Sequence, residues 1–232
     1  MNVIVTGASK GIGKAIATKF AEAGNDLLIC ARNKEQLQNT RDEILAAHKG
    51  VNVYCMPADL SIKEEVSNFA NWCLGYGVPS ILVNNAGVYL PGNTMDEPDN
   101  HLEMMMNTNL YSAYYLTRKL LPAMIEVGRG HIFNICSIAS LDAYKGGGGY
   151  SISKFAMNGF NKNLRHELKP HGIKVTAVYP GAVMTDSWGG FDNSNNRIME
   201  ANDIAALVFS ASNLSIQAVV DEIKITPQLG EL

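Results

Sequence analysis

The chain opens with a glycine-rich turn between a short apolar run and an amphipathic segment. Val3-Ile4-Val5 is typical of a buried strand, and apolar residues recur at helical spacing from Gly11 to Ala23. A helix that begins directly after such a turn exposes its first backbone N–H groups, which can bind phosphate. The turn from Thr6 to Gly13 is therefore predicted to hold a dinucleotide, although a glycine-rich turn can also be a simple strand-to-helix connection.

Strand-like and helix-like segments alternate along the rest of the 232 residues. Six further apolar runs are expected as strands, near 27–30, 51–55, 81–83, 131–136, 173–178 and 219–225. Helical patterns separate them, near 34–48, 62–74, 101–126, 150–168 and 203–212. This alternation predicts βαβ crossovers, and hence a single α/β domain over residues 1–232 with a doubly wound, seven-stranded parallel sheet and helices on both faces.

Composition and charge exclude several classes of function. A net charge of −3, from 19 basic and 22 acidic residues without long runs, gives no footprint for nucleic acid. No apolar run reaches the ~20 residues of a membrane helix, and the start lacks the pattern of a signal peptide. Four dispersed cysteines suit reduced, buried thiols, and five histidines show no metal-ligand spacing. We therefore expect a cytoplasmic protein that acts on small molecules, without a metal, nucleic acid or a membrane.

The end of the second predicted strand bears on which dinucleotide is preferred. NAD sites usually carry an acidic residue ~20 positions beyond the glycines, whereas NADP sites place an arginine nearby. Here the strand ends Cys30-Ala31-Arg32-Asn33, without a carboxylate. Arg32 and Lys10 can bind a 2′-phosphate, with Ser9 as a further donor. Both cations could be ordinary surface charges, but their joint position beside the turn favours NADP(H).

Tyr150 and Lys154 stand four residues apart at the start of a predicted helix. At this spacing two side chains project from one helix face, with Cβ atoms ~5–6 Å apart. A neighbouring ammonium stabilises a phenolate, so the pair suits a tyrosine that donates a proton. A Tyr-x-x-x-Lys pattern also occurs on solvated helix faces, so this interpretation needs support from elsewhere in the chain.

Motifs along the chain supply that support, and together they resemble the short-chain dehydrogenase/reductase family over essentially the full length. Ser137 lies thirteen positions before Tyr150, the interval at which that family places its catalytic serine. Asn109, in Asn-Thr-Asn-Leu, fits the family's catalytic asparagine. The other matching motifs are Thr6 to Gly13, Asp59-Leu60, Asn84-Asn85-Ala86-Gly87, Tyr150-Ser151-Ile152-Ser153-Lys154 and Pro180-Gly181-Ala182-Val183-Met184-Thr185.

The resemblance implies a Rossmann-type fold and a role for each matching residue. Tyr150 would donate a proton to the substrate carbonyl oxygen, and Ser137 would hydrogen-bond that oxygen. Lys154 would hold the nicotinamide ribose, and Asn109 would position this lysine through water. The implied cofactor contacts are Gly7, Ser9, Lys10, Gly11, Ile12, Gly13, Arg32, Asp59, Leu60, Asn85, Ala86, Gly87, Tyr150, Lys154, Pro180, Gly181, Val183 and Thr185.

Substrate choice is expected to come from a short lid at about residues 186–200. Besides Ser137 and Tyr150, we expect Trp188 to contact the substrate. Trp188 and Phe191 can stack on a flat ring, or they can only pack the lid against the body. The segments 180–188, 199–206 and 220–223 look most similar to bacterial sepiapterin reductases. This suggests a pterin side-chain ketone, alongside small diketones and 3-oxoacyl thioesters.

The leading hypothesis is therefore an NADP(H)-dependent reductase that converts a small-molecule carbonyl to a secondary alcohol. An NAD(H)-linked alcohol dehydrogenase or a 3-oxoacyl reductase on the same scaffold is the first alternative. A non-catalytic NADP(H)-binding redox sensor is the second, although such a protein would usually have lost the four catalytic residues. Members of the family commonly form homodimers or homotetramers, so we expect one of these states.

Overall fold

Seven strands form one parallel sheet in the computed structural model, which describes residues 1–185 and 188–231. The strands are β1 (Asn2–Thr6), β2 (Asp26–Ala31), β3 (Val53–Pro57), β4 (Ile81–Asn84), β5 (Gly130–Ile135), β6 (Ile173–Pro180) and β7 (Glu222–Ile225). Their order across the sheet is β3-β2-β1-β4-β5-β6-β7, and every neighbouring pair is parallel. The predicted fold class is therefore confirmed.

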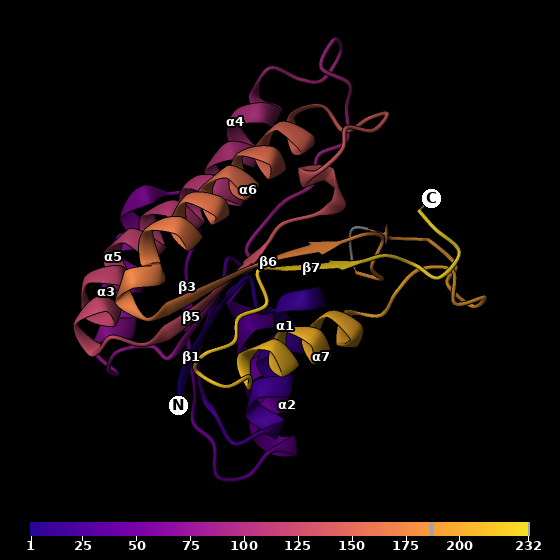
Figure 1. Cartoon of the computed structure of the whole chain (residues 1–232). Coiled ribbons are helices and arrows are strands. Elements are labelled where there is room, and N and C mark those ends of the chain that lie inside the picture. Colours follow the sequence, from indigo (N-terminus) through magenta and orange to yellow (C-terminus); the bar gives the residue numbers. More distant parts are fainter. Residues whose placement is uncertain (186–187, 232) are drawn as a thin grey trace.

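Helices cover both faces of the sheet (Figure 1). One layer contains α1 (Gly11–Glu22), α2 (Lys34–Ala47) and α7 (Ala201–Ser212). The opposite layer contains α3 (Lys63–Leu74), α4 (Asn100–Met106), α5 (Ser112–Val127) and α6 (Gly148–Leu168). The chain crosses from the first layer to the second at β3, because α2 before this strand and α3 after it lie on opposite faces, as a doubly wound fold requires.

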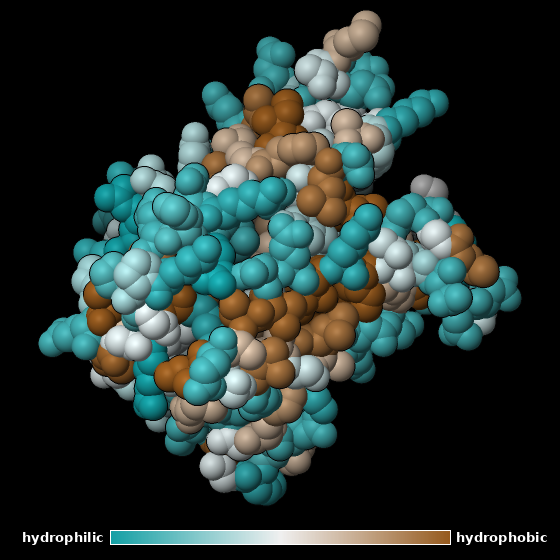
Figure 2. Space-filling view, viewed as in Figure 1, coloured by the Kyte–Doolittle hydropathy of each residue, from teal (hydrophilic) through white to brown (hydrophobic). Residues whose placement is uncertain are grey.

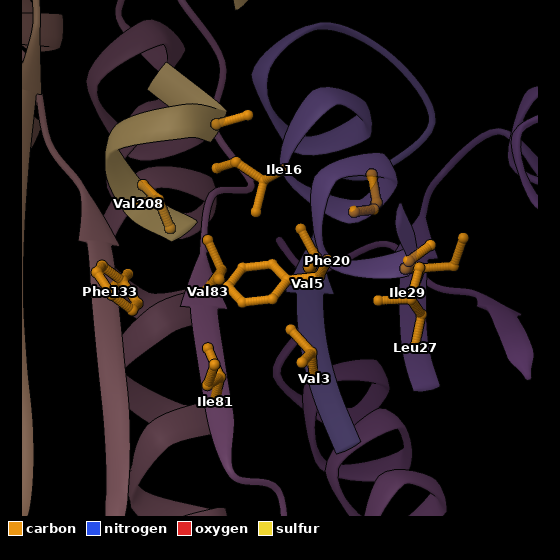
Figure 3. Packing of buried hydrophobic residues seen from close by; sticks show 14 of the residues in the cluster. Val3, Val5, Ile16, Phe20, Leu27, Ile29, Ile81, Val83, Phe133 and Val208 are labelled. Atoms are coloured by element: carbon orange, nitrogen blue, oxygen red, sulfur yellow. The ribbon is translucent and has the colours of Figure 1, made fainter. Parts of the chain in front are cut away.

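The sheet divides the core into two apolar clusters. Along β1, Val3 and Val5 face the layer of α1, α2 and α7, while Ile4 between them faces the other layer. Figure 3 shows Ile16 and Phe20 of α1 packed with the strand residues of the first cluster. Fully burying one such side chain contributes ~1.5–3 kcal/mol. Because both faces are covered, the strands carry the continuous apolar runs from which they were predicted.

Two segments differ from the sequence prediction. The helical region predicted over 101–126 is confirmed, but it consists of α4, a π-helical turn at Asn107–Tyr111 and α5. The π turn differs from an α-helix in its i→i+5 hydrogen bonds, which the spacing of apolar residues does not report. The helix expected from residue 150 begins two residues earlier, because Gly148 and Gly149 are the first residues of α6. The other element boundaries move by a few residues at most.

The cysteine thiols follow the expectation only in part. Cys30, Cys73 and Cys136 are buried free thiols, whereas Cys55 is only partly buried. Burial raises the pKa of Cys30 to about 12 and that of Cys136 to about 11, so both stay protonated. The described residues contain no cluster of three potential metal ligands, and none of their helices could cross a membrane.

Figure 2 shows apolar surface in the middle of one face, over the edge strand β7. Ile223 and Ile225 of this strand are only partly buried. Both side chains pack against the apolar cluster that lies between the sheet and the layer of α1, α2 and α7.

His131, at the start of β5, is a buried histidine held in one tautomer. The Thr176 hydroxyl donates to Val220 O at 2.6 Å, so it must accept from His131 Nε2, which lies 2.7 Å away. The ring stacks on Phe133 at 3.9 Å between centroids, and Nδ1 has no partner among the described residues. Burial, aided by Lys174 and Arg165, lowers the pKa of His131 from 6.5 to about 3.

This histidine should make the fold sensitive to acid. Between pH 6.5 and about 3 the unfolded chain binds the proton and the folded chain does not. As the pH is lowered through this window, the free energy of unfolding should therefore decrease, by up to ~1.4 kcal/mol per pH unit. Urea unfolding between about pH 4 and 7 measures this effect. The free energy of unfolding of the parent should exceed that of His131→Gln by less and less as the pH is lowered. The exposed control His171→Gln should keep the parent's slope, and a pH-independent difference between the parent and His131→Gln would contradict this account.

Candidate active site

A cleft of about 1410 Å³ runs along the carboxyl ends of the parallel strands. Its walls come from the segments that follow β1, β2, β3, β4, β5 and β6, together with the first turns of α6. Every residue predicted to contact cofactor or substrate lines this cleft. Three of the four predicted catalytic residues, Ser137, Tyr150 and Lys154, line it as well, and only Asn109 does not.

Hydrogen bonds of Thr6 and Asn85 join the ends of β1 and β4. The Thr6 hydroxyl donates to Val83 O at 3.3 Å and accepts from the N–H groups of Asn85 and Ala86, both at 2.9 Å. Asn85 Nδ2 donates to Thr6 O at 2.8 Å and to Gly7 O at 3.2 Å. The Asn85 side chain thus ties the end of β4 to the glycine-rich turn.

The glycine-rich turn has the shape that a bound pyrophosphate needs. Gly7 and Gly11 have φ angles of +65° and +56°, where a side chain would be strained. A Cβ on Gly13 would lie 2.4 Å from both Gly7 O and Asn85 Nδ2, so only glycine fits there. Helix α1 begins at Gly11 without a side-chain cap from Lys10. Its first N–H groups therefore remain as a donor set for an anion, which fits a dinucleotide.

Cations lie beside the turn, at the end of the cleft formed by β1 and β2. Arg32 follows β2 directly, and both Arg32 and Lys10 are exposed on the cleft. A hydrogen bond fixes the backbone of Ser9, because the Thr40 hydroxyl donates to Ser9 O at 2.9 Å. The Asp59 carboxylate accepts from its own loop, at 2.7 and 3.0 Å. Arg32 and Lys10 therefore border the part of the cleft in which a phosphate can bind.

Tyr150 and Lys154 reach the cleft from the first two turns of α6. Lys154 is buried, and its Nζ donates to Ile135 O at 2.9 Å, at the end of β5. Nζ lies 5.7 Å from the centre of the Tyr150 ring. Tyr89 meets that ring edge-on, with centroids 4.9 Å apart. The pair that the sequence predicted is thus close together, and the ammonium is anchored to the sheet.

Ser137 begins a short 3-10 turn, Ile138–Ser140, directly after β5. Its Oγ accepts from Ala139 N at 3.1 Å, and its own N–H donates to Ser140 Oγ at 3.1 Å. This reciprocal capping fixes the backbone of the turn. The Ser137 hydroxyl is therefore held at the wall of the cleft.

Asn158 and Tyr179 support this turn, and the sequence analysis did not find them. Asn158 lies one helical turn beyond Lys154 and donates through Nδ2 to Ser140 O at 3.4 Å. Its Oδ1 accepts from the Tyr179 hydroxyl at 2.9 Å. Burial raises the pKa of Tyr179, which keeps this donor protonated. The i, i+4 spacing from Lys154 was the only sequence signal, and it is too common to identify a partner.

Asn109 lies behind the cleft, in the π-helical turn, and is almost fully buried. Its Nδ2 donates to Val88 O at 3.0 Å and to Ser153 Oγ at 2.9 Å, and its Oδ1 accepts from Val88 N at 2.7 Å. A Cβ on Gly87 would lie 3.2 Å from Asn109 Oδ1 and 3.8 Å from Lys154 Nζ. Both groups therefore border the same small space beside Gly87.

A β-bridge connects the two ends of the predicted lid. Val183 forms a β-bridge with Met199, which brings the two ends of the lid together. Trp188 lines the cleft and meets Phe191 edge-on, with centroids 5.3 Å apart. Asp186 and Ser187, the first lid residues, lie outside the described residues.

The carboxyl-terminal segment adds a carboxylate that the sequence analysis also missed. Glu231 lines the cleft, and its Oε2 accepts from Ala182 N at 3.2 Å. Arg197 donates to Gly230 O at 2.8 Å and to Glu231 O at 2.9 Å. The lid and the end of the chain therefore hold each other beside the segment that follows β6.

Fold and cleft together define a dinucleotide-binding α/β protein with a Ser–Tyr–Lys group at the strand ends. The sequence profile of the short chain dehydrogenase family matches residues 1–196. The chain therefore belongs to the short-chain dehydrogenase family, a family of oxidoreductases.

Similar proteins cover nearly the whole chain. An uncharacterized oxidoreductase of Staphylococcus aureus is 33% identical over 97% of this chain and 96% of its own length. A sepiapterin reductase of Chlorobaculum tepidum is 34% identical over 99% of this chain and 97% of its own length. A metagenomic short-chain oxidoreductase solved in complex with NADP is 33% identical, with a TM-score of 0.86 over 98% of this chain and 97% of that chain.

Gly13 offers a direct test of the packing behind the turn. In Gly13→Ala the new methyl group would meet backbone and amide atoms at 2.4 Å, so the turn must shift. Overpacking of this kind should lower the free energy of unfolding by ~1–3 kcal/mol, measured by urea denaturation. Gly159→Ala in α6 is the matched control, because a Cβ there meets nothing within 4 Å. Equal stability of the two variants would show that the turn tolerates a side chain.

Proposed function

We propose that this protein is an NADPH-dependent reductase that converts a carbonyl group of a small molecule to a secondary alcohol. One observation carries the proposal most directly. A single cleft is lined by the glycine-rich turn, by the cations beside it, and by Ser137, Tyr150 and Lys154. A chain that only sensed NADP(H) would not need the second group of residues.

The proposed cofactor is NADP(H). The first N–H groups of α1 would bind the pyrophosphate, and Arg32 and Lys10 would bind the 2′-phosphate. Gly87, Gly181, Val183 and Thr185 would face the nicotinamide end of the cleft. The similar metagenomic enzyme, solved with NADP, supports this preference.

Proton transfer is assigned to Tyr150. When bound, the cofactor supplies a hydride to the carbonyl carbon. The Tyr150 hydroxyl donates its proton to the carbonyl oxygen, while Ser137 Oγ donates a hydrogen bond that orients the same oxygen. The nearby Lys154 ammonium stabilises the phenolate that remains on Tyr150. These roles need both hydroxyls to face one substrate atom, which the shared cleft wall supports.

Return of the proton is assigned to Lys154 and Asn109. Ile135 O accepts one of the three N–H donors of the ammonium. The space beside Gly87, bordered by Lys154 Nζ and Asn109 Oδ1, would hold a water that links the two groups. Such a water would relay a proton, taken up from solvent, by way of Lys154 to Tyr150 after each turnover.

The substrate is proposed to be a small ketone or dicarbonyl, and a pterin side-chain ketone is the leading candidate. The sepiapterin reductase of Chlorobaculum tepidum, 34% identical, supports that choice. Trp188 at the edge of the cleft offers a flat apolar surface for a ring. A single domain over residues 1–232, a substrate lid at about 186–200, a cytoplasmic location and a homodimer or homotetramer stay predictions.

Removing the Tyr150 hydroxyl should abolish reduction. Tyr150→Phe keeps the ring contact with Tyr89 but lacks the proton donor, so kcat should fall by at least ~10²-fold. NADPH consumption with a panel of diketones, ketones and pterins would measure this, and NADPH fluorescence titration would show that the cofactor still binds. Unchanged turnover in Tyr150→Phe would refute the assignment. No consumption by the parent with any carbonyl, despite bound NADPH, would refute the reductase function itself.

Arg32 should set the preference between the two dinucleotides. Arg32→Asp replaces a phosphate-binding cation with a carboxylate that can accept from a ribose 2′-hydroxyl. We expect KM for NADPH to rise by ~10- to 100-fold and KM for NADH to fall, because one charged contact contributes ~1.5–3 kcal/mol. Lys34→Asp, at an exposed position two residues further on, is the control for charge alone. If the parent already uses NADH as well as NADPH, an NAD(H)-linked dehydrogenase becomes the better description.

A further inference from the structure

Two segments far apart in sequence are joined at the start of α6. Gly92 N donates to Gly146 O at 3.2 Å, and Gly146 N donates to Asn93 Oδ1 at 3.1 Å. Gly149 N donates to both carboxylate oxygens of Glu97, at 3.1 and 3.0 Å. These bonds connect the loop after β4 with the glycine run that leads into α6.

The glycine run is what allows this close approach. A Cβ on Gly148 would lie 2.5 Å from Gly92 O and 2.8 Å from Glu97 Oε2, and its φ is +26°. A Cβ on Gly149 would lie 3.2 Å from Glu97 Oε1 and 2.9 Å from the end of Met105. Side chains at these positions would therefore push the Glu97 carboxylate away.

Glu97 is more buried than its neighbours and follows a hydrogen-bonded turn. Among residues 93–100, all of which the structure describes, it alone is not exposed. A turn precedes it, in which Asn93 O accepts from Asp96 N at 3.0 Å and from Glu97 N at 2.9 Å. The residue before α6, Gly147, has no side chain with which to cap the helix. A carboxylate from elsewhere in the chain takes that place, where the helix dipole favours negative charge.

We propose that Glu97 is a positioning residue for Tyr150. Gly149, which its carboxylate binds, is the residue directly before Tyr150. The same loop after β4 carries Tyr89, whose ring meets Tyr150 edge-on. The Glu97 carboxylate therefore fixes the backbone of the turn from which Tyr150 projects, and holds the loop whose Tyr89 confines the ring.

This inference rests on the proposed function, in which Tyr150 donates the proton. Misplacement of a reacting group by about 1 Å can lower a rate by ~10²-fold. Loss of the carboxylate should therefore slow the chemical step while the NADP(H) end of the cleft, built on α1 and β2, stays intact. A variant without this carboxylate should therefore have a lower kcat but an unchanged affinity for NADPH.

The first experiment compares Glu97→Ala with Glu97→Gln in the full-length protein. We expect kcat for carbonyl reduction in Glu97→Ala to fall by about 10- to 100-fold, with the Kd for NADPH within about twofold of the parent. Glu97→Gln keeps an oxygen that can accept from Gly149 N, so it should recover most of kcat. Glu103→Ala, which removes an exposed carboxylate from α4, should match the parent.

A second variant pair tests the same contact from the other side. Gly148→Ala should displace Glu97 and lower kcat as Glu97→Ala does. Gly159→Ala, also in α6 but with open space around the new methyl group, should leave kcat unchanged. This pair keeps the proposal testable if Glu97→Ala is poorly folded.

The outcomes separate this inference from the proposed function. Parent-like kcat in Glu97→Ala and Gly148→Ala, with Tyr150→Phe inactive, would overturn the positioning role and leave the reductase function standing. An active Tyr150→Phe would overturn the proposed function instead. A parallel loss of Tm, NADPH affinity and kcat in both variants would show that the contact only stabilises the fold, and would also overturn the positioning role.

Discussion

The hydrogen bonds between Thr6 and Asn85 close the sheet at the point where its strand order reverses. β1 and β4 are neighbours, but the chain leaves β1 toward α1 on one face and leaves β4 toward α4 on the other. The two connections diverge and leave a crevice, the usual ligand site of such a sheet. The Thr6 hydroxyl and the Asn85 amide prevent the strand ends from separating further. The glycine-rich turn on one side and the catalytic wall on the other therefore keep a fixed spacing.

Helix α6 is the second fixed element, and polar contacts set its register on the sheet. Lys154, Asn158 and Asn161 lie on its buried face, one or two turns apart. They bind Ile135 O, Ser140 O and Asn134 Nδ2. A slide of the helix would leave these buried groups unpaired, at a cost of ~1–3 kcal/mol each. Apolar packing alone tolerates small slides, so the polar contacts are what define where Tyr150 lies.

The sequence predicted the sheet well because both of its faces are buried. Continuous apolar runs such as Val3-Ile4-Val5 identify the strands, and the glycine-rich turn identifies which strand end binds the ligand. Periodicity predicted the helical region over 101–126 but not its π-helical turn at Asn107–Tyr111, because apolar spacing does not report which backbone groups are hydrogen-bonded. The start of α6 was expected at Tyr150 and lies at Gly148, because glycine has a low helix propensity and a tertiary contact stabilises the helix start here.

The residues missing from the predicted site share one property, which is that their partners are remote in sequence. Glu97 binds a residue 52 positions away, and Glu231 binds one 49 positions away. A lone glutamate carries no local pattern that distinguishes such a role from solvation. Short-range spacing could identify Tyr150 with Lys154, but only the fold shows that Glu97 binds Gly149 and that Glu231 binds Ala182.

The buried Lys154 ammonium connects the stability of the cleft with its proposed chemistry. An ammonium has three N–H donors, and Ile135 O accepts one of them. Holding this charge at 5% exposure is costly unless further acceptors are close. A ribose hydroxyl, a water beside Gly87 and the Tyr150 oxygen are the acceptors that the proposed complex would bring to it. The cost of burial is then offset most fully when cofactor is bound and Tyr150 has given up its proton, which is the state that carbonyl reduction must pass through.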